Sequence, residues 1–335
     1  MKKRAYIQNE FSTAGKRLTI RESTRLDDKA LIGLHNDVFN SSVHDDWFDW
    51  KYDSGNGESV SVWHNDAMIA HCGGVPRKLW HQGKLFKGIQ IGDVMVSPNW
   101  RGILTRTGPF YRVSDAFYKS RLQNRNSFEL GFGFPSQRHI KLALKVGLLM
   151  DAGPVWQAAW DAYATDNRNF KITPLKIGPR FVLKYFFSCS RMHSQLHQFW
   201  HGERSLSYLY WRYIKRPSFD YQFWLIENST HPSSSGIAVT RYQPGPSPDL
   251  LWLDWIGDTQ ILDSALKCLR SLASDMDCRT VSTWGTTPVI HAMSSYSDFN
   301  VSEVARIGIP TSSKECDRAT QGALWWLMAG DTDFL

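Results

Sequence analysis

A repeated aromatic pattern constrains the fold of this 335-residue chain more than any other feature. The triplet Trp-Lys-Tyr at residues 50–52 matches Trp-Arg-Tyr at residues 211–213. Each triplet is followed, 12 and 13 residues after its Trp, by a dipeptide that ends in Trp: Val62-Trp63 in the first half and Phe223-Trp224 in the second. Self-similarity of this kind predicts two copies of one structural unit rather than two unrelated domains.

The predicted helices and strands follow one order in both halves. An apolar strand at residues 89–96 carries Asp93, and its counterpart at residues 251–256 carries Asp254. Hydrophobic periodicity then predicts a helix, a strand, a helix and a strand. These elements cover residues 110–122, 127–134, 136–146 and 153–160 in the first half, and residues 261–274, 279–284, 288–293 and 323–329 in the second. Two mixed α/β units in tandem are therefore expected.

A basic segment at residues 164–204 separates the two predicted units. It holds seven Lys or Arg residues against Asp166 and Glu203. This change in composition predicts a linker between an N-terminal unit at residues 1–163 and a C-terminal unit at residues 205–335. The alternative is an amphipathic contact of residues 181–187 with a membrane surface or a partner.

The composition describes a globular protein with an excess of positive charge. Hydrophobic residues make up 42% and charged residues 21% of the chain, proportions that allow a sizeable core. The net charge of +7 and the pI of about 9.1 favour anionic partners such as nucleotides or phosphates. Nucleic acid is not expected as a partner, because the sequence has no long Lys/Arg block and no recognition motif.

The cysteines, histidines and apolar runs indicate the cellular setting. The five Cys are widely spaced and form no C-x-x-C, so neither a zinc site nor a disulfide framework is expected. His193, His197 and His201 have helical spacing and could bind Zn²⁺ from one helix, but a solvated or interdomain stripe is the preferred interpretation, and no metal is expected. With no signal peptide and no transmembrane run evident, we expect a cytoplasmic protein.

Residues 91–110 carry the clearest functional signal. Their sequence, IGDVMVSPNWRGILTRTGPF, predicts a buried strand, a turn, a basic loop with glycine and the start of a helix. N–H groups at a helix N-terminus bind phosphate, and Arg101, Arg106 and Arg112 add positive charge there. The second copy has only Gly-Asp-Thr-Gln, residues 257–260, in this position. Only the first copy is therefore expected to bind a phosphate-bearing ligand.

Three motifs resemble the GCN5-related N-acetyltransferase (GNAT) superfamily. Residues 96–102, VSPNWRG, resemble the V-x-P-x-aromatic-R-G opening of its acetyl-CoA loop. Residues 131–136 and 142–147 resemble the G-F-P-N and K-L-G segments of a two-domain subgroup, and residues 326–333 also resemble that subgroup. The resemblance implies two tandem GNAT-like units, each a mixed, mostly antiparallel central sheet flanked by helices.

The resemblance also implies a site in the first unit for acetyl-CoA or another acyl-CoA as co-substrate. The backbone of the central strand would hold the pantetheine arm, and the loop would hold the phosphates. Ser136 stands at a position where Asn is common in the superfamily, and its hydroxyl can still donate or accept one hydrogen bond. The implied binding residues are Val94, Met95, Val96, Arg101, Gly102, Arg106, Thr107, Gly108 and Ser136.

The loop departs from the R/Q-x-x-G-x-G/A pattern that is usual in the superfamily. Counting from Arg101 places Leu104 and Arg106 where the two glycines stand. A side chain at a position of close approach obstructs contact with the backbone, so the phosphates are expected nearer Gly108. Ala143 occupies a position where many members carry a Tyr that protonates the leaving thiolate.

Asp93 is the candidate catalytic residue. Burial in an apolar strand would raise the pKa of its carboxyl group and suit a general base. The alternative is a structural carboxylate that pairs with an Arg or caps a neighbouring loop. Asp254 favours this alternative, because it occupies the same place in the copy that has no basic loop.

The resemblance implies an N-acyltransferase in which the amine of a small metabolite or amino sugar attacks the thioester of acyl-CoA directly. Surface-polysaccharide biosynthesis is one setting that the subgroup suggests.

Two alternatives to this function stay open. One is an aminoacyl-tRNA-dependent peptidyltransferase, a class that also pairs two GNAT-like units but lacks a functional CoA loop; the other is a non-catalytic acyl-CoA-binding protein. The sequence leaves the oligomeric state open.

Overall fold

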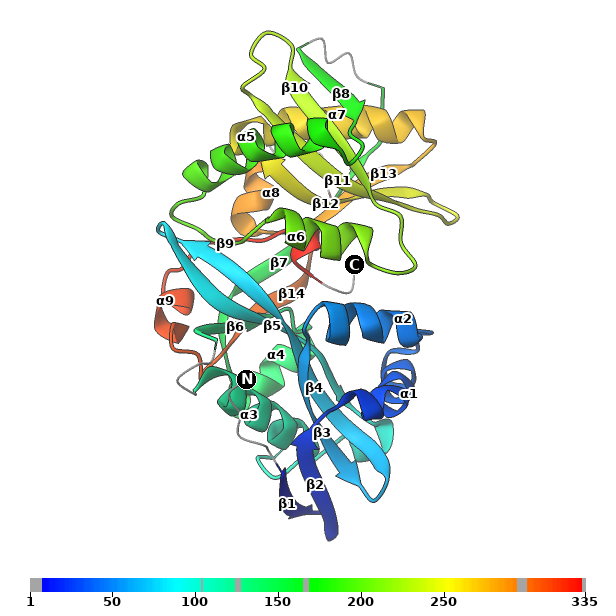
Figure 1. Cartoon of the computed structure of the whole chain (residues 1–335), viewed down its shortest axis with the longest axis vertical. Coiled ribbons are helices and arrows are strands. Elements are labelled where there is room, and N and C mark those ends of the chain that lie inside the picture. Colours follow the sequence, from blue (N-terminus) through cyan, green and yellow to red (C-terminus); the bar gives the residue numbers. More distant parts are fainter. Residues whose placement is uncertain (1–7, 104, 124–127, 165–168, 294–299, 333–335) are drawn as a thin grey trace.

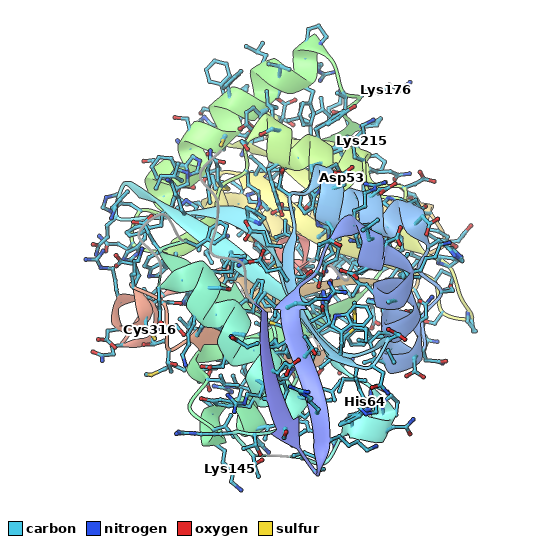
Figure 2. The ribbon with its side chains drawn as sticks, turned by 60° about the horizontal axis from the view of Figure 1, so that its bottom comes forward. Asp53, His64, Lys145, Lys176, Lys215 and Cys316 are labelled. Carbon is cyan, nitrogen blue, oxygen red and sulfur yellow. The ribbon has the colours of Figure 1, made fainter. Side chains whose placement is uncertain are left out.

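The structure is a computed structural model that describes residues 8–103, 105–123, 128–164, 169–293 and 300–332. The chain forms two lobes, of which the lower contains most of the first half of the sequence and the upper most of the second (Figure 1). His64 and Lys145 of the first half lie at the end of the molecule away from Lys176 of the second (Figure 2). The two lobes are the two units that the repeat predicts.

The first unit is built on a mostly antiparallel sheet. Its antiparallel neighbours follow the order of the chain: β1 (Gln8–Thr13), β2 (Lys16–Glu22), β3 (Glu58–His64), β4 (Ala67–His81) and β5 (Lys84–Val96). The next strand, β6 (Leu130–Gly133), lies parallel to β5. This change of direction requires a crossover through a helix.

Helices cover both faces of this sheet. One face packs against α1 (Asp28–Phe39) and α2 (Asp45–Phe48), and the other against α3 (Pro109–Leu122) and α4 (Gln137–Lys145). Successive side chains of a strand point to opposite faces, so Met95 packs with α1 while Val94 and Val96 pack on the α3 side. Gly147, with a φ of 76°, follows the end of α4 in the left-handed conformation that its position predicts.

The second unit repeats this arrangement. Its sheet contains, in spatial order, β13 (Thr280–Thr286), β12 (Asp249–Gly257), β11 (Ser235–Gln243), β10 (Gln222–Asn228) and β8 (Phe170–Pro174). One face packs against α5 (Pro179–Gln195) and α6 (Leu206–Leu209), and the other against α7 (Leu262–Asp275) and α8 (Thr287–Met293). Three short elements, β9 (Trp200–Gly202), α9 (Cys316–Thr320) and β15 (Trp325–Trp326), come from the second half of the chain but share a core with β4, β5 and β6 of the first unit. Of the helices that the structure describes, none has the length and apolar character to cross a membrane.

Two predicted segments differ from the structure. The predicted linker at residues 164–204 contains β8 and α5, which belong to the second unit and correspond to β2 and α1 of the first. Its basic residues suggested a linker because Arg180 and Arg191 lie on the exposed side of α5. The strand predicted at residues 323–329 is reduced to β15, and the true counterpart of the strand at residues 153–160 is β14 (Asn300–Pro310).

The two units exchange strands. The last strand of the first half, β7 (Leu149–Asp161), pairs antiparallel with β13 of the second unit. In return β14 lies between β7 and β6, the parallel strand of the first unit. The two exchanged strands pair with each other where the lobes meet (Figure 1). A continuous sheet therefore runs through both units.

The repeated Trp residues lie side by side between the units. The rings of Trp50 and Trp211 stack with their centroids 4.8 Å apart and their planes 5° from parallel. Each indole N–H donates to the backbone carbonyl of the other residue at 2.9 Å. Equal contacts in both directions indicate an approximate two-fold relation between the units, and they confirm the repeat that the sequence shows.

A buried carboxylate near the C-terminus also joins the units. Asp331 is fully buried and accepts from Arg77 of β4 at 3.0 Å and from Arg204 of the second unit at 2.7 and 2.9 Å. Burial by itself raises the pKa of Asp331, but the two guanidinium groups outweigh burial and hold that pKa below its usual value. Arg204 also pairs with Asp254 at 2.7 Å.

Replacing Asp331 by Asn should destabilise the protein strongly, because it leaves two buried guanidinium groups without their shared carboxylate. Breaking a buried ion pair from one side typically costs about 3–5 kcal/mol. Urea unfolding at neutral pH measures this loss. Asp263→Asn is the matched control: Asp263 pairs with Lys267 on the surface of α7, and its loss should cost under about 1 kcal/mol. Similar unfolding midpoints for the two variants would contradict the role given to Asp331.

Candidate functional site

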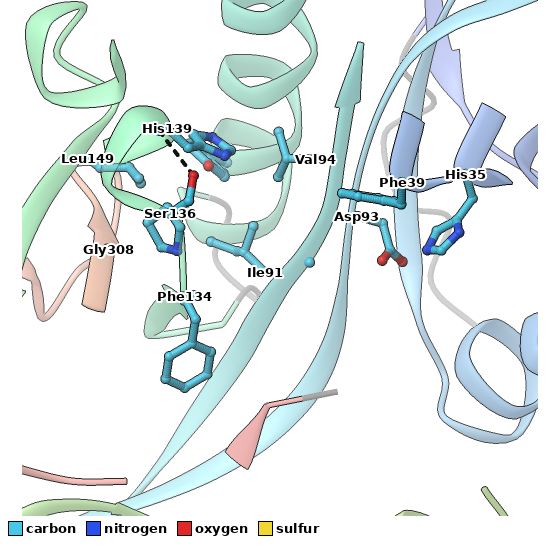
Figure 3. A pocket seen from close by; sticks show the side chains of 14 residues that line it. His35, Phe39, Ile91, Asp93, Val94, Phe134, Ser136, His139, Leu149 and Gly308 are labelled. Carbon is cyan, nitrogen blue, oxygen red and sulfur yellow. Dashed lines mark hydrogen bonds between the residues drawn. The ribbon is translucent and has the colours of Figure 1, made fainter. Parts of the chain in front are cut away.

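A cavity of about 440 Å³ opens where β5 and β6 separate. In the part of the chain that the structure describes, the two strands pair only from Gly88 to Ile91 of β5. Beyond that point the cavity lies between β5, the turn from β6 into α4, α1 and α3 (Figure 3). Leu149 of β7 and Gly308 of β14 complete its wall. The exchanged strands thus form part of a cavity in the first unit.

A bulge in β5 turns two successive residues toward this cavity. The register between β4 and β5 shifts between His71 and Gly73, opposite Asp93 and Val94. Strand alternation would send Asp93 and Val94 to opposite sides, but both line the cavity. Asp93 has a φ of 51°, a conformation that costs a non-glycine residue about 1–3 kcal/mol. Such bulges are frequent next to active sites.

Two side chains of the π-helical turn Asp49–Ser54 hold the Asp93 carboxylate. Lys51 Nζ lies 2.7 Å from Oδ2, and the Tyr52 hydroxyl donates to the same oxygen at 2.5 Å. Burial raises the pKa of Asp93, as the sequence predicts, but Lys51 and then His35 and His71 outweigh burial and lower that pKa to about 2. The predicted rise in pKa is therefore wrong. Asp93 is ionised at neutral pH and has little tendency to take up a proton.

His71 lies behind this carboxylate and has no exposed surface. Its Nδ1 donates to the backbone carbonyl of Asp93 at 2.8 Å. Burial is the largest influence on His71 and lowers the pKa of its ring to about 4, so the ring is neutral at pH 7. His71 therefore supports the bulge as a neutral donor.

A second cavity, of about 360 Å³, meets the first one at His35 and Asp93. It lies between the α1–α2 region of the first unit and residues 216–219 of the second. At the junction the side chains of His35 and Asp93 point toward each other (Figure 3). His35 Nδ1 hydrogen-bonds to Ser41 Oγ at 2.8 Å, and its ring contacts Trp47 with centroids 4.6 Å apart. The two cavities thus share His35 and Asp93 on their walls.

Of the residues that the sequence assigns to acyl-CoA, two lie on the wall of the first cavity. Val94 and Ser136 line it. Ser136 also precedes α4, where its hydroxyl accepts from the backbone N–H of His139 at 3.4 Å (Figure 3). Met95 packs on the α1 side of the sheet and Val96 on the α3 side.

The basic loop begins beside the end of β5, outside the cavity wall. Arg101 Nε donates to the backbone carbonyl of Val96 at 3.0 Å. Gly102 has a φ of 96° and open space around it. Leu104, which the sequence places at a glycine position, lies outside the described residues.

The loop then leads into α3. Arg106 and Thr107 are exposed, and Gly108 is the buried residue that precedes the helix. A β-carbon at Gly108 would lie 2.1 Å from the Ile103 carbonyl oxygen, so the loop folds back on itself at this glycine. The sequence places the phosphate anchor near Gly108, and that assignment stays a prediction.

The sequence does not single out three polar residues on the cavity wall: His35, Tyr118 and His139. Tyr118 of α3 and His139 of α4 both line the 440 Å³ cavity. Burial raises the pKa of Tyr118 well above its usual value and lowers the pKa of His139 to about 4. In the sequence, Tyr118 has the spacing of a core residue on an amphipathic helix. Nothing in that spacing shows that the helix borders a cavity. Ala143, at the expected Tyr position, is buried in α4.

The chain itself fills the corresponding place in the second unit. β12 and β13 pair in parallel only over Asp249–Leu251 of β12, and the segment around Met328 then bridges to Gly285 of β13. The buried turn Ala329–Asp331 follows it against β12. Tyr213 donates to Asp254 there at 2.8 Å, as Tyr52 does to Asp93. The open cavity of the first unit thus corresponds to closed core in the second.

The predicted histidine stripe is not on one helix. α5 ends at Gln195, and His201 lies on β9, where its Nε2 hydrogen-bonds to His193 Nδ1 at 2.9 Å. The ring of His193 packs on Trp80 of the first unit, so the pair lies between the units. Among the described residues no group of three or more His, Cys, Asp or Glu is arranged to hold a metal ion.

Comparison with known proteins gives matches among solved structures. A conserved Enterococcus faecalis protein of unknown function, described as a probable N-acyltransferase, has a TM-score of 0.64 at 10% identity over 90% of this chain and 74% of its own. A GCN5-related N-acetyltransferase from Anabaena variabilis has a TM-score of 0.64 at 13% identity, over 88% and 72%. Saccharomyces cerevisiae N-myristoyltransferase with bound myristoyl-CoA has a TM-score of 0.56 at 10% identity, over 88% and 78%. No protein-family model and no curated protein matches the sequence.

At these identities the comparisons establish the fold. The chain has the fold of the GCN5-related N-acetyltransferases, in two tandem units with mixed, mostly antiparallel sheets flanked by helices. The fold that the sequence motifs predict is therefore confirmed.

Acid should weaken the fold through His71. Its pKa is about 4 in the folded chain against about 6.5 when unfolded, so the unfolded chain takes up a proton that the folded one does not. Stability therefore falls as the pH drops below about 6.5, by about 2 kcal/mol from this residue between pH 7 and pH 5. Urea unfolding of the parent and of His71→Gln at both pH values tests this. In His71→Gln the loss of unfolding free energy between pH 7 and pH 5 should be about 2 kcal/mol smaller than in the parent. In the exposed control His231→Gln this loss should equal that of the parent. An unchanged pH dependence in His71→Gln would contradict the assignment.

Proposed function

We propose that the protein is an acyl-CoA-dependent N-acyltransferase whose active site lies in the first unit. The observation that supports this proposal is the pair of cavities that meet at His35 and Asp93. One opens between the diverging strands and carries Val94 and Ser136 on its wall; the other opens between the two units. A donor and an acceptor that entered from opposite sides would meet at this junction.

The 440 Å³ cavity suits the pantetheine arm and acyl group of the donor. Much of its wall is apolar, with contributions from Phe39, Ile91 and Phe134. Beyond Ile91 the edge of β5 that faces the cavity is not paired with β6 in the described chain, so its backbone groups can bond to the amides of the arm. The exposed Arg101 and Arg106 lie in the loop that the sequence assigns to the phosphates. The yeast structure with this fold holds an acyl-CoA, myristoyl-CoA.

The 360 Å³ cavity suits a small amine as acceptor. Asp46 of the first unit and Arg216 of the second both line it, together with Trp47. A carboxylate can bind an ammonium group, and a guanidinium binds carboxylate or phosphate. A small amine that also carries a negative charge, such as an amino acid or a phosphorylated amino sugar, would match both. This acceptor class is part of the proposal.

The transfer needs a neutral amine at the thioester carbonyl. The ammonium proton would pass to His35, which lies at the junction beside the ionised Asp93. Asp93 would stabilise the imidazolium rather than take the proton itself, because its own pKa is too low. The amine nitrogen would then form its bond to the carbonyl carbon as the bond from carbon to sulfur breaks, and CoA would leave as a thiolate. The proton that the new amide nitrogen gives up would pass to this thiolate, so that a neutral amide and CoA thiol are released. Tyr118 stays protonated and would donate a hydrogen bond to that sulfur.

Calorimetric titration with acetyl-CoA, a longer acyl-CoA and free CoA tests the donor site. The parent should bind at least one of them. Val94→Trp, which fills the cavity, should weaken binding at least ~10-fold. Arg101→Ala with Arg106→Ala should weaken it ~10-fold or more, and less so at high salt. Arg318→Ala, an exposed arginine on α9, is the control and should bind like the parent. A parent protein that binds none of the three ligands overturns the proposal.

Release of CoA thiol across a panel of amines, amino acids and amino sugars tests the reaction. With the best acceptor, His35→Gln should lower kcat by ~10²–10⁴-fold at neutral pH and leave the affinity for acyl-CoA nearly unchanged. Higher pH should restore part of the rate, because the amine then loses its proton to solvent. His231→Gln, on an exposed loop of the second unit, is the control. A kcat within ~3-fold of the parent would contradict the role of His35, and acyl-CoA binding without turnover would indicate a non-catalytic binding protein.

A further inference from the structure

The helix α5 has two apolar faces although it covers only one sheet. Its inner face, with Phe181, Tyr185 and Met192, is buried against the second unit. Its outer face exposes Leu183 at 58%, Phe186 at 60% and Phe187 at 70% of their surfaces. A surface helix normally presents polar side chains to water. A contiguous exposed apolar patch of this kind marks an interaction surface.

The charge around this patch is positive. Between residues 169 and 202 the sequence contains no Asp or Glu. Lys176, Arg180 and Arg191 are exposed on or just before α5. Lys184 pairs with Glu227 of β10 and Arg191 pairs with Asp258 at 3.0 Å, so these two cations are partly neutralised. The apolar patch thus lies among cations that attract an anionic surface.

The apolar surface continues beyond the N-terminal end of α5. Ile177 and Ile214 are both exposed and line a shallow cleft of about 370 Å³ together with Leu175. Lys176 lies beside this cleft, at the outer end of the second unit (Figure 2). Figure 1 shows α5 along the outside of that lobe, where a flat surface can reach it.

We propose that α5 binds the second unit to the surface of a lipid bilayer that contains anionic lipids. Leu183, Phe186 and Phe187 would enter the boundary between headgroups and acyl chains, and Lys176 and Arg180 would contact the lipid phosphates. A helix lying in the interface needs an apolar face, basic flanks and no span, and α5 has these features. The net charge of +7 acts in the same direction over a longer range. This proposal is independent of the reaction proposed for the first unit.

A second copy of the chain is the competing occupant of an apolar face. Lys176 and Arg180 argue against it, because a face that meets its own copy by two-fold symmetry brings these like charges together. A bilayer with anionic lipids instead supplies the opposite charge along the whole patch. The charge pattern therefore favours the bilayer.

Sedimentation of the full chain with vesicles tests the proposal. The protein should bind vesicles of phosphatidylcholine with added phosphatidylglycerol and bind phosphatidylcholine vesicles weakly, with salt reducing the difference. Phe186→Ser with Phe187→Ser should lower binding to both kinds at least ~10-fold. Lys176→Gln with Arg180→Gln should lower binding to the anionic vesicles alone, by about 5-fold for each charge.

Leu26→Ser is the matched control, since Leu26 is 94% exposed in the first unit, away from α5. It should bind vesicles like the parent, and circular dichroism should show that every variant remains folded. Failure of the parent to bind anionic vesicles overturns the proposal. So does equal binding by the Phe186→Ser/Phe187→Ser variant and the Leu26→Ser control. A dimer in solution that the double Phe variant abolishes would also overturn it, because the face would then be covered by a second copy.

Discussion

The exchange of β7 and β14 is the constraint on which the rest of the structure depends. A strand in the middle of a sheet must find partners for its backbone groups on both edges. Here β6 of the first unit finds its neighbour in β14 from the second half, and β13 of the second unit finds its neighbour in β7 from the first. Neither half completes its sheet from its own residues. The stacked Trp50 and Trp211 and the buried Asp331 then hold the two units in the one arrangement that this pairing allows.

The exchange also shapes the candidate site. Gly308 of β14 lies on the wall of the first unit's cavity, where a β-carbon would come within 3.0 Å of Leu149 and Pro135. On the opposite wall the bulge presents Asp93, whose charge is fixed by Lys51. The repeat places the same Tyr–Asp contact in the second unit, but there Arg204 and the C-terminal turn occupy the space. The two units thus share a scaffold, and they differ in what lies between the diverging strands.

The sequence predicts the units, the order of their elements and the strand that carries the site. It does so because Trp50, Trp211, Asp93 and Asp254 occupy equivalent core positions, and core positions keep their spacing when a unit is repeated. It does not show the strand exchange, since β7 and β14 have the same pattern whichever sheet they join. The predicted rise in the pKa of Asp93 is wrong for a related reason. Its partner Lys51 is distant in the chain, and only folding brings the two side chains together.

The misassigned segments have a physical explanation as well. Residues 164–204 look like a linker because one side of α5 is basic and exposed, although the other side is core. The apolar run at residues 323–329 looks like a strand, but it fills the cleft of the second unit and pairs only briefly. Tyr118 and His139 reach the cavity through the packing of α3 and α4, which no local pattern records.

The exchanged strands have a consequence for the covalent connection between the halves. The two halves of the sequence are joined covalently once, between β7 and β8, whereas the hydrogen-bonded contacts between them run along the sheet in both directions. A polypeptide divided between β7 and β8 would keep all of these pairings as a complex of two chains. In that sense the molecule is an intertwined heterodimer whose subunits share one backbone, and neither fragment alone contains a complete site.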